Sequence, residues 1–283
     1  MAAVLGTNVA SLWASKNLQS AQSNMANSVE RLSSGLRINR ARDDAAGLGL
    51  ANALTQQINS SEQGIRNLND GISIVQTAEG ALSQASEMAQ RILSLAVQAT
   101  NDTLSTTQKT SISSEMLQLI TGINNIQTRT KFSGNALLGA STAITIYNGK
   151  ESTDKIDIST TALAAISSGS GAAGNSLYTS VNTATTNSTS GSFQAVAASA
   201  SAYITTLDTQ RGLLGALQNQ MEYSVNNITE LSANLTSARS RVVDTDYASE
   251  TANLTKGQIL QQAATAMLAQ ANQMPNVILS LLK

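Results

Sequence analysis

The stretch that decides the fold is DDAAGLGLANALTQQINSSEQGIRNLNDGISIVQTAEGALSQASEMAQRILSLAVQAT, residues 43 to 100. It contains no proline, and its apolar residues recur at alternating steps of three and four. That spacing predicts one continuous α-helix with a single apolar seam. At 1.5 Å per residue such a helix would reach roughly 85 Å, far beyond the average helix of globular domains. The predicted seam is Leu54, Ile58, Ile65, Leu68, Ile72, Val75, Ala78, Leu82, Ala85, Ala89, Ile92, Leu95 and Ala99.

A polar helix with one apolar stripe has to bury that stripe against other helices. Similar helical patterns occur in residues 1–36 and 105–129, from about residue 193 to 240, and in the last 35 or so residues. Two short β-like runs, 143–147 and 155–158, flank Asn148-Gly149 and predict a β-hairpin. The predicted fold is mainly α: a long antiparallel helical coiled-coil bundle with its terminal helices paired, a small β-hairpin and a short variable insert.

The predicted insert covers residues 159–192. No charged residue occurs between 159 and 207, and Ser, Thr, Ala, Asn and Gly crowd the stretch 167–192. This composition indicates a surface insert with no core of its own.

The composition excludes most catalytic and metal-binding sites. The chain has no Cys and no His, which rules out Cys or His zinc sites, His general bases, Cys nucleophiles and disulfides. The net charge of -1 provides no basic surface for nucleic acid, and no run of apolar residues is long enough to cross a membrane. The N-terminus lacks a basic segment followed by a long apolar core, so no cleaved secretory signal is expected. We therefore expect no enzyme activity and no cofactor.

Two groups of charged residues flank the predicted helices. Asp43-Asp44 and Asp244-Asp246 precede helix starts, where capping is a simpler explanation than paired catalytic carboxylates or a calcium site. The connector arginines are either a solvated link or contacts between subunits, and we favour subunit contacts. The residues assigned to such contacts are Arg37, Arg40, Arg42, Asp43 and Asp44.

The apolar stripes of the two terminal helices have no obvious partner within one chain, since a pair of helices leaves much apolar surface open. Copies of the same chain are the simplest partner. The residues predicted to mediate self-assembly are Leu5, Val9, Leu12, Leu32, Leu36, Leu260, Ala264, Met267, Ala271, Ile278 and Leu281.

Several runs resemble the bacterial flagellins, the subunits of the flagellar filament. They include ERLSSGLRINRARDDAAGLGLAN at residues 30–52, RNLNDGISIVQTAEGALSQ at 66–84, SRVVDTDYASE at 240–250 and QQAATAMLAQANQMPNVILSLL at 261–282. The resemblance implies an inner tube of terminal helices (1–42 and 241–283), an outer layer of long helices with the hairpin (43–158 and 193–240), and an insert (159–192) facing solvent. Terminal segments would be disordered before assembly and helical afterwards.

The resemblance also implies partners. They are copies of the chain itself in a helical homopolymer, an export chaperone, the filament cap and the hook-associated proteins, with the filament outside the cell and export without a cleaved signal peptide. The Toll-like receptor that senses flagellin would contact Gln90, Arg91, Leu95 and Glu115. Two other functions stay open: a hook–filament junction protein, and a surface-displayed flagellin homologue that binds polysaccharide.

Overall fold

A computed structural model describes residues 8–138, 143–158 and 173–281, with no account of the side chains of 173–175 and 274–281. The described chain is mainly helical, with two small antiparallel strand pairs. It divides into two compact units: unit 1 is residues 1–58 with 233–283, and unit 2 is residues 59–232. Within the described residues, no helix combines the length and hydropathy that a membrane crossing requires.

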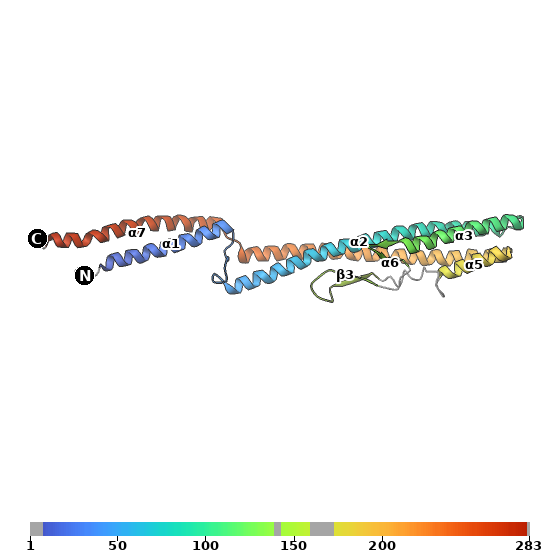
Figure 1. Cartoon of the computed structure of the whole chain (residues 1–283), viewed down its shortest axis with the longest axis horizontal. Helices are drawn as coiled ribbons and strands as arrows, with labels where there is room; N and C mark the ends of the chain where they lie inside the picture. Colours follow the sequence, from blue (N-terminus) through green and yellow to red (C-terminus); the bar gives the residue numbers. More distant parts are fainter. Residues whose placement is uncertain (1–7, 139–142, 159–172, 282–283) are drawn as a thin grey trace. The chain divides into compact units, whose positions relative to one another are not determined.

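Unit 1 pairs the two terminal helices, as predicted. Helix α1 (Val9–Ser34) begins after Asn8, whose side-chain oxygen accepts from the Ser11 backbone N–H, and it ends at Gly35 with φ of 73°. Helix α7 (Tyr247–Leu281) runs alongside it (Figure 1). The pair is antiparallel, because Asn8 donates to the carbonyl of Ala271, 263 residues later, at 2.7 Å.

The seam between α1 and α7 alternates small residues with larger half-buried ones such as Leu18, Met25 and Leu254. Buried or half-buried positions on both helices recur at steps of three and four, the spacing of a coiled coil. Small side chains at these positions let the two backbones approach closely. The most deeply buried positions are Ala14, Ala21 and Ser28 on α1, and Glu250, Gly257 and Ala271 on α7.

The chain between α1 and the long helix α2 (Ala45–Ala99) is held by backbone and carboxylate contacts. Asp44 Oδ1 accepts from the Gly47 N–H at 2.8 Å, so the predicted capping by Asp44 is confirmed. Asp43 does not cap the helix: its Oδ2 accepts from the N–H of Asn39 and of Arg40, because the connector turns back there. At the other helix start, Asp246 Oδ1 accepts from the Ala248 N–H at 2.9 Å and caps α7, also as predicted.

Unit 2 is a helical bundle of α2, α3 (Thr106–Arg129), α5 (Ala173–Asn187) and α6 (Ser190–Val243) (Figure 1). Helix α3 begins with a reciprocal cap in which Ser105 and Gln108 bond each other's backbone N–H. The predicted α2 seam is confirmed, since each of its residues is buried or half-buried. The largest fully buried side chains are Leu68, Leu82, Ile92, Met116, Leu137, Ile158, Leu177, Phe193, Tyr203, Leu207 and Met221.

The predicted β-hairpin is confirmed as β3 (Ile144–Tyr147) paired with β4 (Lys155–Ile158). Its tip lies on α2, where Asn67 donates to the carbonyl of Tyr147 at 2.8 Å. A second strand pair, β1 (Lys131–Phe132) with β2 (Asn135–Ala136), was not predicted.

The predicted insert contains a helix that the sequence interpretation did not assign. Residues 159–172 lie outside the described residues, but the following stretch forms α5, which packs against α3. Its contact side carries Leu177, Val181 and Ala184, which are all buried. This part of the insert therefore belongs to the core of unit 2.

Candidate assembly surfaces

The most exposed large apolar side chains of unit 1 lie on α1 and α7. Leu12 on α1 and Met267 on α7 keep 69% and 65% of their surface in contact with solvent, although α1 and α7 pack against each other. Isolated exposed apolar residues are ordinary, whereas a continuous group of them marks an interaction surface. Trp13, Leu260 and Met267 form such a group, because they line one groove. We call the exposed large apolar residues of both helices around it the terminal surface: Val9, Leu12, Trp13, Ile259, Leu260 and Met267.

A groove of 620 Å³ runs between α1 and α7 beside the seam. Trp13 lines one side of it, and Leu260 and Met267 line the other. The ammonium of Lys16 lies 5.4 Å from the centre of the Trp13 ring, within the range of a cation–π contact. The groove offers an apolar hollow in which a side chain of another helix could be buried.

The residues predicted for self-assembly fall into four groups. Val9, Leu12, Leu260 and Met267 are exposed, as a contact between copies requires. Leu32, Leu36 and Ala264 are half-buried, and Ala271 is buried in the seam with α1. Ala271 is thus covered within one chain, in the seam where α1 and α7 pack together. Leu5 lies outside the described residues, as do the side chains of Ile278 and Leu281.

The connector arginines have partners within their own chain. Arg37 donates to the carbonyl of Val242 at 2.7 Å, and Arg40 pairs with Glu30 at 2.7 Å. Arg42 lies 3.6 Å from Asp43, and the Arg40 N–H that donates to Asp43 lowers the pKa of that carboxyl. Arg40 and Arg42 remain largely exposed, so the subunit contacts assigned to this connector stay a prediction.

The residues assigned to receptor contact lie on α2 and α3 of unit 2. Arg91 forms an exposed ion pair with Glu115 at 2.8 Å, and Gln90 is exposed beside them. Leu95 differs, because it is 2% exposed and belongs to the core between the helices. Its side chain cannot reach a receptor while the bundle is folded, which corrects its assignment.

Comparison with known proteins places both ends of the chain in one family. Residues 5–143 match the bacterial flagellin N-terminal helical region, and residues 198–282 match the bacterial flagellin C-terminal helical region. The flagellin of Bacillus subtilis is 36% identical over 98% of this chain and 98% of its own length. The flagellin of Halalkalibacterium halodurans is 35% identical over 99% of this chain and 100% of its own. A crystal structure of Bacillus cereus flagellin aligns with a TM-score of 0.48 and 23% identity, over 62% of this chain and 94% of that one.

The chain therefore belongs to the bacterial flagellin family. It is a structural subunit of the flagellar filament, which lies outside the cell and drives motility, and it is not an enzyme. Within the family, the flagellins of Vibrio species match over the full length of both chains at 31 to 32% identity.

Proposed function

We propose that copies of this chain join through the terminal surface on α1 and α7. The observation that supports this is the exposure of its large apolar side chains beside the seam between the two helices. Each square ångström of apolar surface removed from water contributes about 25 cal/mol, so covering this surface strongly favours association. A contact between unlike surfaces that does not close into a ring yields an open helical filament.

The second part of the proposal assigns each segment of the chain a place in the filament. Residues 1–42 with 241–283 would form the inner tube, and residues 43–158 with 193–240 the outer layer, to which α5 of the 159–192 insert also belongs. The arginine connector would contact a neighbouring subunit through Arg40 and Arg42, which are exposed. Family membership supports this plan, and it supports export without a cleaved signal, an export chaperone, and contacts with the filament cap and hook-associated proteins.

Receptor recognition is a third part. The exposed group of Gln90, Arg91 and Glu115 supports a contact with the flagellin-sensing Toll-like receptor, because a planar guanidinium held by a carboxylate presents a fixed pattern of donors. Leu95 would act only by supporting α2 from within the core.

The assembly proposal is tested by charging the terminal surface. Leu12→Asp and Met267→Asp should each prevent polymerisation of purified chain after salting out, measured by sedimentation and electron microscopy. Burying an unpaired carboxylate in an apolar contact is strongly unfavourable. Gln19→Asp is the matched control, because Gln19 is an exposed polar residue on the same helix and pays the same helix-propensity cost.

Two outcomes would contradict the proposal. If Leu12→Asp polymerises as well as Gln19→Asp does, the terminal surface is not the contact. If the unmodified chain forms no long filaments alone, the hook–filament junction hypothesis becomes the better one.

A further inference from the structure

The sulfur atoms of this chain all belong to thioethers, because it has seven methionines and no cysteine. The structure describes five of these side chains. Met116 and Met221 are fully buried, and Met25 and Met88 are half-buried. Met267 on α7 is the exception, because 65% of its surface is in contact with solvent. Among the described side chains, it is therefore the one methionine that a reagent in water reaches freely.

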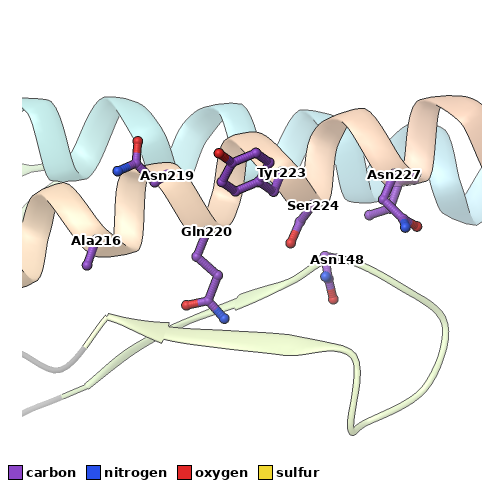
Figure 2. Close-up of a pocket in the computed structure, with 8 residues that line it drawn as sticks. Asn148, Ala216, Asn219, Gln220, Tyr223, Ser224 and Asn227 are labelled. Carbon is purple, nitrogen blue, oxygen red and sulfur yellow. The ribbon is translucent and has the colours of Figure 1, made fainter.

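The shielded sulfurs of unit 2 pack against glycines of neighbouring helices. A Cβ at Gly71 of α2 would lie 2.9 Å from the Met221 sulfur, and a Cβ at Gly122 of α3 would lie 3.1 Å from the Met88 sulfur. The hollow of 670 Å³ between α6 and the hairpin tip has no methionine among its described lining residues, although Met221 is on the same helix (Figure 2). Unit 2 thus keeps its described thioethers away from solvent.

Met267 instead lines the 620 Å³ groove between α1 and α7. None of the described lining residues is charged, and six of them are alanines. Under the assembly proposal a second copy covers this groove. A chemical change at Met267 therefore alters the surface that the neighbouring copy has to cover.

A hydroperoxide oxidises a thioether in one two-electron step. The sulfur lone pair attacks one peroxide oxygen, the S–O bond forms as the O–O bond breaks, and hydrogen peroxide is reduced to water. The product, methionine sulfoxide, is polar and chiral, whereas the thioether was apolar and flexible. Thiolates compete for peroxide in many proteins, but this chain has no cysteine. An exposed methionine is then the favoured target.

We propose that Met267 is an oxidation site at which a hydroperoxide blocks assembly of the chain. This rests on the proposed function, because it requires the terminal surface to be the contact between copies. A second copy that covers the oxidised groove has to bury the sulfoxide oxygen among alanines, and burying a polar group without a hydrogen-bond partner opposes association. In a chain that is already part of the filament, the neighbour covers Met267 and the thioether persists.

Trp13 is the competing target, because it is 59% exposed in the same groove and indole is also oxidised. Methionine sulfoxide reductases separate the two explanations. They return the sulfoxide to the thioether with a thiol as reductant, and they leave oxidised indole unchanged. Reductases A and B are used together, since each reduces one sulfoxide epimer. The thiol has no disulfide to break in this chain.

The test treats full-length monomer and filaments with hydrogen peroxide and locates the added oxygen by fragmentation mass spectrometry. Fragmentation is needed because Met267 and Met274 share the tryptic peptide 257–283. In the monomer, Met267 should react at least about tenfold faster than Met116 and Met221, because peroxide does not reach their buried sulfurs. In filaments the Met267 rate should fall about tenfold, because a covered contact excludes water and peroxide with it.

Sedimentation then measures polymerisation of the oxidised monomer. Its critical concentration should rise about tenfold, and treatment with both reductases should restore the original value. Two variants are each compared with their own untreated sample. Met267→Leu has no thioether at this position and should polymerise equally before and after peroxide. Met88→Leu is the matched control, because it removes a half-buried thioether of unit 2 by the same substitution and should stay sensitive.

The proposal is overturned if Met267 reacts no faster than Met116, or if Met267→Leu stays sensitive to peroxide. It is also overturned if the oxidised chain polymerises as well as the untreated one, since a lining amide such as Gln270 would then pair with the sulfoxide oxygen. Failure of the reductases to restore polymerisation would make Trp13 the site instead.

Failure of the assembly proposal gives a different result. Leu12→Asp and Met267→Asp would then polymerise as well as Gln19→Asp, whatever the oxidation rates are. If both aspartate variants are blocked and the oxidised chain is not, the terminal surface is the contact and only the oxidation proposal is wrong.

Discussion

Tyr203 shows how one side chain limits the stability of the bundle. It lies on α6 with 1% of its surface exposed, and its hydroxyl has no hydrogen-bond partner among the described residues. Burial raises the pKa of Tyr203 above its ordinary value of 10, because the charged phenolate would lose its solvation. The packed ring favours folding, whereas the unpaired hydroxyl opposes it.

Tyr203→Phe should raise the free energy of unfolding by about 1 kcal/mol at neutral pH, measured by urea titration. The pH dependence follows from the raised pKa. Above pH 10 the unfolded phenol ionises while the folded one keeps its proton, so the original chain loses stability as pH rises. The Tyr203→Phe variant should lose less stability over the same pH range. Tyr178→Phe, at an exposed position, should change neither the free energy of unfolding nor its pH dependence. If Tyr203→Phe is less stable than the original chain, the Tyr203 hydroxyl is paired, which contradicts the prediction.

Lys109 is the most deeply buried cation of the described chain, with 7% of its side chain exposed. Its ammonium lies 3.3 Å from Asp102 Oδ1 and 3.3 Å from Ser190 Oγ, which ties the α2–α3 turn to the start of α6. The Ser190 hydroxyl also donates to Asp102 and holds the pKa of that carboxyl below its usual range.

Asp102→Ala should lower the urea midpoint more than Lys109→Met does. Removing the carboxylate leaves the buried ammonium with only the neutral Ser190 hydroxyl, whereas methionine replaces the lysine stem and removes the charge itself. The double variant should resemble Lys109→Met alone. If Lys109→Met is the more damaging of the two, the ion pair stabilises the bundle beyond the cost of burying it.

At the scale of elements, two glycines of α2 differ in their surroundings, because the hairpin packs against Gly64 and no described residue packs against Gly80. A Cβ at Gly64 would overlap the carbonyl oxygen of Asn148 at the hairpin tip, while a Cβ at Gly80 would meet nothing within 4 Å. Gly64 is therefore needed for the hairpin to lie against the helix.

Gly64→Ala should lower the free energy of unfolding by about 1 to 3 kcal/mol and raise hydrogen exchange in β3 and β4, because the hairpin has to move away. Gly80→Ala should raise it by about 0.5 to 1 kcal/mol, since alanine favours the helix and nothing is displaced. Equal stabilisation by both substitutions would mean that the hairpin is not seated on Gly64.

The same elements show what the sequence could predict. The α2 seam was predictable because apolar residues repeat at helical spacing over many turns, and burial followed that pattern. Helix α5 was missed because Ser, Thr, Asn and Gly dominate its sequence, although Leu177, Val181 and Ala184 have the spacing of one helical side. In α1 and α7 the prediction assigned the large apolar residues to contacts between copies of the chain and named no residues for the seam between the two helices. In the structure the most deeply buried seam positions include Ala14, Ala21, Gly257 and Ala271, which let the helices approach closely.

At the scale of the whole molecule, the core is unevenly distributed between the two units. The large side chains with less than 2% exposure all belong to residues 59–232 of the described chain. Unit 1 relies mainly on alanine, serine and glycine at the most deeply buried positions of its seam and leaves Leu12 and Met267 in solvent. Because each buried methylene contributes about 0.8 kcal/mol, unit 1 should be the first to open.

Limited trypsin digestion of the monomer should therefore cut first at Lys16 and Lys256 in unit 1. The similarly exposed Arg66 and Arg91 of unit 2 should resist, because cleavage there requires opening of the larger core. Polymerised chain should lose the early cuts, since copies cover the terminal surface and association stabilises the folded helices. The Arg66 and Arg91 sites serve as the internal control for helix accessibility. A monomer that resists trypsin equally in both units would mean that the α1–α7 pair is stable by itself, and assembly would then not be needed to complete it.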